Sequence, residues 1–449
     1  MVVFGSAGAT LLAAAAAAVP SALPASAVAP AATCTYEQQQ AASARLRTSQ
    51  RAMARQRAAF VKKQQKQLNA LRASASCTVP SVAPSSTESC SFLPTRNAAD
   101  VSANAQGWMM LNEGPIGPGT FTPSLGAVRG VILMVAFSDY PPPSGSAAAI
   151  AQVYSPDPKY FKEVSYGRFA LSVDTVDRWF ELPDPAATYF NGSYDYRLKL
   201  FAHTVDVADP YVDFSRYRFA IIVPTSRFVG GLNNGWAKMP GFGARSAEGE
   251  IRLGAMLTSD ISRFGPAAAR VANHEFMHSM GLPDLYFDDG STRGWDPMSS
   301  MPGIPSNPGV HLIGWHKWRL GWLDPAQLTC VTTPGTREET LSAIAVAGGK
   351  KLMVVPTGAS TAYVVEARTK IGYDSAICEE GVLVYEVDSQ INNAELREGR
   401  GVIAMKGPRR CLGTAAGALH TGESFEDSEV KVEVLARDAK AFRVRVTKK

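Results

Sequence analysis

The feature that most constrains this chain is the stretch HEFMH at residues 274–278, which lies between Pro266 and Gly281. Proline suits the start of a helix and glycine its end, so the enclosed AAARVANHEFMHSM is predicted to be a helix of about four turns. The four-residue spacing places His274 and His278 on one helical face, as two ligands of a tetrahedral Zn²⁺ require. Glu275 then lies beside the metal, where a carboxylate can take a proton from water.

A third ligand is expected within the residues that follow this helix. Gly281 can adopt the left-handed conformation that turns the chain, and Asp284 comes three residues later, which completes the pattern HExxHxxGxxD. Asp288, in the next loop, is an alternative that could instead cap, turn or hold Ca²⁺. Glu366 is a more distant alternative if the C-terminal region folds over the cleft. Otherwise, Glu366 is expected in a buried pair with Arg368.

Two further segments carry candidate site residues. The sequence WDPMS at residues 295–299 predicts a tight turn that carries Met298. It resembles the methionine turn of metzincin peptidases, which packs beneath the metal as an apolar floor, and ordinary core packing of Met298 is the alternative. His311 and His316 lie in the aromatic-rich HLIGWHKWRLGWL, which favours a packed helix. The alternative for either histidine, and for Tyr286, is a hydrogen bond to a transition-state oxyanion.

Beyond the zinc motif, the chain resembles a known family over residues 128–388. HEFMHSMGLPDLYFDD, GWDPMS and HLIGWHKWRLGWL resemble the peptidase core of the immune-inhibitor-A-like family of secreted bacterial metallopeptidases. VILMVAFSDYP, YFKEVSYGRFALS, ADPYVDFSRYRFAIIV, AYVVEARTKIGYD and GVLVYEVD resemble further blocks of that family. The resemblance implies a zinc-dependent endopeptidase that acts on proteins or peptides and is made as a secreted precursor with an inhibitory pro-segment. Phe287 departs from the family pattern, which commonly has an aspartate there.

Strand and helix signals predict two differently built regions. Up to residue 265 they alternate, which predicts a mixed α/β sandwich. Within it, the β-branched and apolar residues 128–137 and 219–223 predict buried strands. Residues 160–182 predict a helix that leads into a hairpin, and residues 250–257 predict a strand at a sheet edge. After Leu323 the sequence changes to short strands with polar turns. We therefore predict an α/β (mixed α+β) metzincin-like zinc peptidase domain over 101–323 and an antiparallel all-β domain over 324–449.

The N-terminal residues predict segments that are removed from the mature protein. Residues 1–27 are apolar and end in ASA, a small-x-small pattern typical of a signal peptide, with a membrane anchor as the alternative. Residues 28–100 are predicted to be a pro-segment, with a basic helix over 36–73 and a Pro/Ser/Thr linker over 78–100. The alternative for this helix is a solvated arm. In the pro-segment interpretation, Asp100 or Cys90 occupies the water position on the metal.

Charge is concentrated in that N-terminal helix. Nine Lys/Arg against one acid give residues 35–76 a balance of +8, whereas the whole chain carries +5, so residues from Cys77 onward sum to −3. This distribution argues against a general nucleic-acid-binding role for the body of the protein. No later segment is apolar for long enough to span a bilayer.

Six cysteines suit an oxidising compartment. They divide into Cys34, Cys77 and Cys90 near the N-terminus and Cys330, Cys378 and Cys411 near the C-terminus. Full pairing therefore needs at least one bridge between the two groups, unless one thiol stays free.

Two classes of function fit these observations. The first is a secreted zinc endopeptidase with Glu275 as general base, and the second is a surface protein that uses a degenerate peptidase scaffold and the β domain for binding. The intact HExxH pattern favours the enzyme, because a pseudo-enzyme is expected to lose Glu275 or a ligand first. A zinc hydrolase that acts on something other than peptides also fits the motif. The predicted edge strand over 250–257 favours peptides as substrates, since an extended peptide can pair with such an edge.

Overall fold

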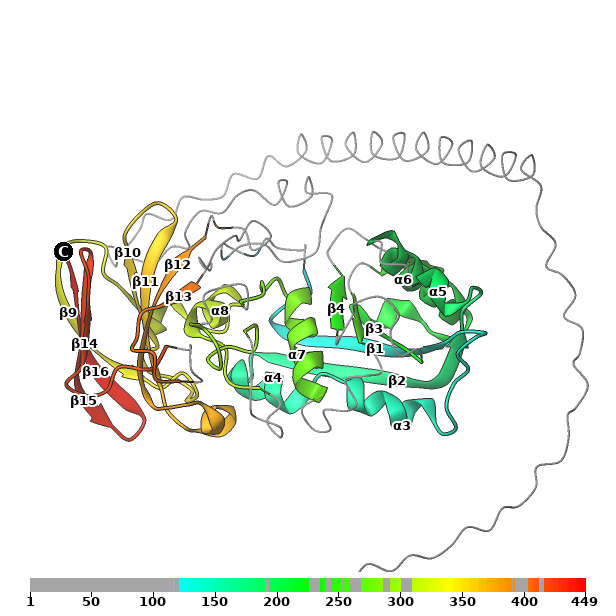
Figure 1. The fold of residues 1–449 in the computed structure, drawn as a ribbon, viewed down its shortest axis with the longest axis horizontal. Coiled ribbons are helices and arrows are strands. Elements are labelled where there is room, and N and C mark those ends of the chain that lie inside the picture. Colours follow the sequence, from blue (N-terminus) through cyan, green and yellow to red (C-terminus); the bar gives the residue numbers. More distant parts are fainter. Residues whose placement is uncertain are drawn as a thin grey trace, which may run out of the picture. The chain divides into compact units, whose positions relative to one another are not determined.

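The computed structural model describes residues 113, 116, 121–189, 194–225, 235–238, 244–251, 254–257, 268–285, 291–299, 309–389, 391, 403–411 and 416–449. The described part of the chain is mixed α/β, with several sheets and few helices (Figure 1). It belongs to one compact unit formed by residues 86–449. The predicted signal peptide, basic helix and linker lie outside the described residues. Across the described segments, no helix combines the length and apolarity needed to cross a bilayer.

The first sheet is built around the long strand β1 (Gly126–Ala136). Its strand order is β2-β1-β3-β7-β4, formed by β2 (Phe169–Glu181), β3 (Phe219–Pro224), β7 (Gly254–Leu257) and β4 (Gly235–Lys238). All pairings are parallel except that of β4 with β7, which is antiparallel. The strands expected near 128–137 and 219–223 are therefore confirmed.

Two local expectations for this sheet are wrong. Residues 169–181 form the single strand β2, which pairs along β1 instead of folding back as a hairpin. Residues 250–257 are divided between β6 (Gly249–Ile251), which pairs with β5 (Ala244–Ser246), and β7. Strand β7 lies between β3 and β4, so β4 is the edge strand on this side. Alternation over a few residues does not show how many neighbours a strand has.

Both faces of β1 are covered by helices, which is why its sequence is almost continuously apolar. Val128, Ile132 and Met134 belong to one hydrophobic cluster, and Val131 and Val135 belong to another on the opposite face. The first face packs against α3 (Ala147–Ala151), α4 (Pro158–Val164) and α7 (Ala268–Ser279). The second packs against α5 (Ala186–Tyr189) and α6 (Tyr194–Ala208), as Figure 1 shows.

The C-terminal region forms two further sheets, in the orders β13-β12-β11-β10-β8 and β14-β15-β16-β9. The strands are β8 (Leu328–Cys330), β9 (Gly335–Ser342), β10 (Leu352–Pro356), β11 (Thr361–Arg368), β12 (Gly381–Asp388), β13 (Ile403–Met405), β14 (Ser424–Glu426), β15 (Val430–Asp438) and β16 (Ala441–Lys448). Pairing is antiparallel except between β8 and β10. Alternate apolar residues of β11, β15 and β16 fill a common core between the sheets. The predicted strands of this region are confirmed.

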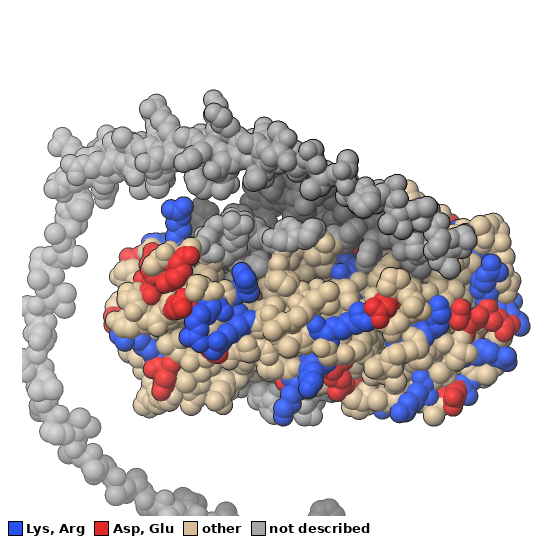
Figure 2. All heavy atoms as spheres, turned by 180° about the vertical axis from the view of Figure 1, so that it is seen from behind, with Lys and Arg blue, Asp and Glu red and all other residues tan. Residues whose placement is uncertain are grey.

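The exposed face of the β9–β16–β15 sheet carries alternating charges. Arg445 Nη2 lies 2.7 Å from Glu338 Oε1, and Arg445 Nη1 lies 3.8 Å from Glu433 Oε2. Figure 2 shows one face of the molecule, on which basic and acidic side chains are interspersed. Such pairs are screened by water and contribute little to the free energy of unfolding.

The β region shares a core with the first sheet. One hydrophobic cluster extends from Ile132 in β1 through α7 to Tyr385 in β12. At this junction lies α8 (Gly314–Arg319), whose first N–H donates to Glu366 of β11. A disulfide joins Cys378 to Cys411 within the β region, and Cys330 is disulfide-bonded to a partner outside the described residues.

Candidate metal centre

The predicted helix is present as α7, and its C-terminal end sets the direction of the chain toward Asp284. Gly281 has a φ of +102°, its N–H donates to His278 O at 2.9 Å, and the N–H of Leu282 donates to Met277 O at 3.2 Å. This pair of hydrogen bonds is a Schellman motif, which needs a residue such as glycine in the left-handed region. The motif reverses the chain within three residues of the helix.

The reversal brings Asp284 against both histidines. Asp284 Oδ1 lies 3.0 Å from His274 Nε2 and 3.2 Å from His278 Nε2. The two imidazole rings are nearly perpendicular, with centroids 4.7 Å apart. One ligand atom of each residue lies within 4.8 Å of the other two, and the described residues contain no second group of this kind. The sequence-predicted set of His274, His278 and Asp284 is therefore assembled in space.

Backbone carbonyls orient both imidazoles. His274 Nδ1 donates to Pro297 O at 2.9 Å, and His278 Nδ1 donates to Leu282 O at 2.7 Å. A carbonyl oxygen only accepts, so the proton of each neutral ring is on Nδ1. The lone pairs on Nε2 therefore point toward the Asp284 carboxylate. This arrangement of outer hydrogen bonds is typical of histidines that bind metal.

The donor atoms of this cluster need a positive charge between them. Burial alone would lower the pKa of His274, but the hydrogen bond and the charge of Asp284 raise it to about 9. Burial would raise the pKa of Asp284, but the two histidines hold it well below its usual range. A proton on the His274 ring can supply that charge. Two imidazole nitrogens and one carboxylate oxygen also fit a catalytic Zn²⁺ site, which has three protein ligands and one open position.

Glu275 and the WDPMS turn lie beside this cluster. Glu275 is 7% exposed, and its charge contributes to the raised pKa of His274. Met298 is fully buried, and its carbonyl accepts from the N–H of Leu285, next to Asp284, at 2.8 Å. The turn is therefore joined to the cluster through Leu285 and through the carbonyl of Pro297.

Glu366 does not belong to the cluster. Its carboxylate is fully buried, lies 3.2 Å from Arg368 Nη1 and accepts from the hydroxyl of Tyr385 at 2.8 Å. Burial raises the pKa of Glu366, and the positive charge of Arg368 opposes that rise. The structure therefore shows the buried pair with Arg368, and not the third ligand considered from the sequence. Asp288 and Tyr286, and with them the suggested Ca²⁺ loop, lie outside the described residues.

The two histidines after the turn are held in buried polar networks. His311 Nε2 lies 3.1 Å from Glu163 Oε1, and its Nδ1 lies 2.9 Å from Lys317 Nζ. His316 lies between Asp296 Oδ2, at 2.9 Å from its Nδ1, and Glu113 Oε1, at 3.0 Å from its Nε2. All four ring nitrogens are occupied, so the oxyanion role considered for these histidines is not supported.

Sequence reasoning missed Glu113 and Asp296. Glu113 is fully buried although its surroundings in the sequence show no strand or helix periodicity, so no sequence signal marked it. Asp296 stands before a proline in a turn, a place where aspartate commonly caps the backbone. The Asp296 carboxylate accepts from the N–H of Met298 at 2.7 Å. That pattern could have identified Asp296 as the residue that shapes the turn.

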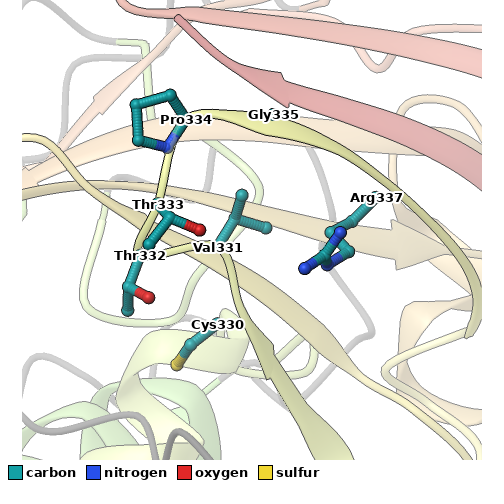
Figure 3. Close-up of a pocket in the computed structure, with 7 residues that line it drawn as sticks. All are labelled: Cys330, Val331, Thr332, Thr333, Pro334, Gly335 and Arg337. Atoms are coloured by element: carbon teal, nitrogen blue, oxygen red, sulfur yellow. The ribbon is translucent and has the colours of Figure 1, made fainter.

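A separate pocket lies at the connection between β8 and β9. Figure 3 shows its lining residues, Cys330, Val331, Thr332, Thr333, Pro334, Gly335 and Arg337. None of them belongs to the His/Asp cluster.

In comparisons with known proteins, no family model matches the chain, and no curated protein matches it. The interpretation of the site therefore depends on its own geometry.

Proposed function

We propose that this chain is a secreted, metzincin-like zinc endopeptidase similar to the immune-inhibitor-A-like family. The observation that carries the proposal is the convergence of His274 Nε2, His278 Nε2 and Asp284 Oδ1, with Glu275 beside them on α7. The Nδ1 hydrogen bonds turn the Nε2 atom of each ring toward Asp284, where a cation would be coordinated. His274, His278 and Asp284 would hold the zinc.

Each residue of the site has a defined task in peptide hydrolysis. Zn²⁺, when bound, acts as a Lewis acid and lowers the pKa of water to about 7. Glu275 accepts the proton of the attacking water and delivers it to the leaving amine nitrogen. Pro297 O and Leu282 O keep His274 and His278 in the coordinating tautomer. Met298 would provide the apolar floor of the site.

An extended peptide is the substrate that suits the neighbouring sheet. Strand β4 pairs with β7 on one side and is the last strand of the described sheet on the other. It lies next to α7, the helix that carries the two histidines (Figure 1). Backbone groups on the outer edge of β4 can pair with a substrate backbone and align it with the metal.

Secretion and latency complete the proposal. The Cys378–Cys411 disulfide suits an oxidising compartment. Residues 1–27 would be the signal peptide, and residues 28–100 would be the pro-segment that blocks the site through Asp100 or Cys90. The full-length protein should then be nearly inactive and gain activity when cut between residues 78 and 101. Equal activity before and after the cut would refute the latency.

The decisive experiment combines metal analysis with cleavage of an unstructured protein such as casein, before and after limited proteolysis between residues 78 and 101. We expect one zinc per chain in the wild type and in Glu275→Ala. The variant should lose about 10²- to 10⁴-fold in rate, because the base is removed and the ligands remain. Residual activity above about a tenth of the wild type would refute the role of Glu275. A zinc-loaded wild type that cleaves nothing, even after limited proteolysis, would favour the binding scaffold.

A further inference from the structure

The structure contains a buried group of four alternating charges outside the ligand set. His316 lies between the carboxylates of Asp296 and Glu113, at 2.9 and 3.0 Å. Glu113 also accepts from Arg319 Nη1 at 2.9 Å through its second oxygen. Asp296, His316 and Glu113 are completely inaccessible to solvent, and Arg319 is 8% exposed. We call these four residues the charge bridge.

One end of the charge bridge reaches a hydrogen-bond partner of a proposed ligand. Asp296 accepts from the N–H of Met298 at 2.7 Å and from the N–H of Ile313 at 2.9 Å, so its carboxylate joins the turn to the residue before α8. The next residue is Pro297, whose carbonyl accepts from His274 Nδ1. A displacement of Asp296 therefore moves the group that sets the tautomer and orientation of His274.

The other end reaches the turn between the remaining two ligands. Arg319 Nη2 donates to Gly281 O at 3.3 Å, within the motif that reverses the chain between His278 and Asp284. Ile116, three residues after Glu113, lies against the same glycine, since a Cβ built on Gly281 would be 3.3 Å from its side chain. The charge bridge thus contacts the backbone on both sides of the cluster.

Stability alone does not account for these charges. Burying an ion is unfavourable before it is paired, and well-packed apolar side chains would often stabilise the same volume as well or better. Charges with directed hydrogen bonds fix a geometry that apolar contacts do not. The geometry fixed here is that of the WDPMS turn and the Gly281 turn, which carry the outer hydrogen bonds of the cluster.

We propose that Glu113 and His316 are positioning residues of the metal centre, which act on His274 through Asp296 and Pro297. The proposal rests on the proposed function in taking His274 as a ligand.

The positioning role of Glu113 also has a consequence for processing. A mature enzyme must retain Glu113, because a cut after this residue would leave His316 and Arg319 buried without their shared carboxylate. Pro-segment removal is therefore expected before residue 113.

The test uses the full chain loaded with Co²⁺ in place of zinc, because the visible absorption of Co²⁺ reports ligand geometry without any assay of activity. Glu113→Gln and His316→Gln are compared with the wild type for the Co²⁺ spectrum and for Zn²⁺ affinity by chelator competition. Loss of an outer-shell partner typically weakens metal binding about 10- to 100-fold. We expect a weakening of this size in both variants, together with a changed spectrum.

A matched control separates positioning from loss of stability. Lys351 is also fully buried, but its Nζ donates to Ala343 O, and none of its hydrogen bonds in the described structure reaches the cluster. Lys351→Met should lower the free energy of unfolding and leave the Co²⁺ spectrum unchanged. If Glu113→Gln does not fold, Glu113→Asp keeps the charge at a shorter reach and should give the same spectral change.

The outcomes distinguish this inference from the proposed function. Folded Glu113→Gln and His316→Gln proteins with a wild-type spectrum and Zn²⁺ affinity within twofold would overturn the positioning role. A spectral change in Lys351→Met equal to theirs would also overturn it. A wild type that binds Co²⁺ but hydrolyses no peptide, even after limited proteolysis between residues 78 and 101, would refute only the proposed function, while the spectral comparison would still decide the positioning role. A wild type that binds no metal would overturn both.

Discussion

Replacing Arg368 by methionine should destabilise the protein far more than any change to a surface ion pair. Arg368 is fully buried on β11. It donates to Asp374 through Nε and Nη2 at 2.9 and 2.8 Å, and to Glu366 through Nη1 at 3.2 Å. It also donates to the carbonyls of Trp295 and His311, both at 3.0 Å. Methionine has a similar length but removes all five hydrogen bonds.

The magnitude follows from what remains behind. Removing one partner of a buried ion pair typically costs about 3–5 kcal/mol, because the other charge is left uncompensated. Here two carboxylates remain, and burial already raises the pKa of both Glu366 and Asp374, with Arg368 opposing the rise. Without Arg368 both pKa values should rise further. An acid with a raised folded-state pKa destabilises the fold as pH increases. The loss should therefore be large at pH 7 and smaller at pH 5.

Urea unfolding at the two pH values measures this loss. With denaturant slopes on the order of 3 kcal/mol per molar for a chain of this size, the midpoint should fall by roughly 1 M or more at pH 7. Arg368→Lys keeps the charge but not the planar fork, so it should be intermediate. Arg445→Met, which removes the exposed pairs with Glu338 and Glu433, is the control and should not change the midpoint measurably. An Arg368→Met midpoint equal to the control would refute the reasoning.

Three further predictions concern the candidate metal centre and its surroundings. Asp284→Ala should sharply lower Zn²⁺ affinity in a competition titration, whereas Glu366→Gln should keep one zinc per chain. Loss of zinc in Glu366→Gln would show that the proposed ligand set is wrong. Burial lowers the pKa of His316, but the charges of Asp296 and Glu113 raise it to about 9. Glu113 also pairs with Arg319. The His316→Gln variant should therefore show its full loss of unfolding free energy below about pH 6.5, and this loss should shrink toward pH 9. A loss that stays constant across that range would contradict the prediction. Gly281→Ala should destabilise the fold by about 1 kcal/mol or more, because an L-residue is strained at a φ of +102°. Its unfolding curve should also show a larger loss than Gly348→Ala, where φ is +74° and a Cβ meets open space.

The sequence predicted those parts of the molecule that depend on short-range patterns. The i,i+4 histidines define α7 because helical spacing alone determines which side chains share a face. Strands β1 and β3 were recognisable because burial on both faces makes their sequences almost uniformly apolar. Gly281 and Asp284 followed from the requirement for a left-handed turn directly after the helix.

Features that depend on distant pairing were not predictable in this way. Strand β2 continues along β1 for most of its length, and its own sequence does not reveal that partner. The interior position of β7 depends on β4, a four-residue strand that lies earlier in the chain. Glu113 reaches His316 across more than two hundred residues, a contact that no local pattern encodes. Register and neighbours are properties of the assembled sheet and core.

The candidate centre therefore combines a local motif with remote support. All three proposed ligands lie within residues 274–284, so their chemistry can be read from a short segment of sequence. Their orientation comes from elsewhere, since Pro297 O holds His274 and Asp296 holds the turn that contains that carbonyl. The same turn accepts a hydrogen bond from Arg368 through Trp295 O. The β region thus supplies part of the framework of the candidate centre.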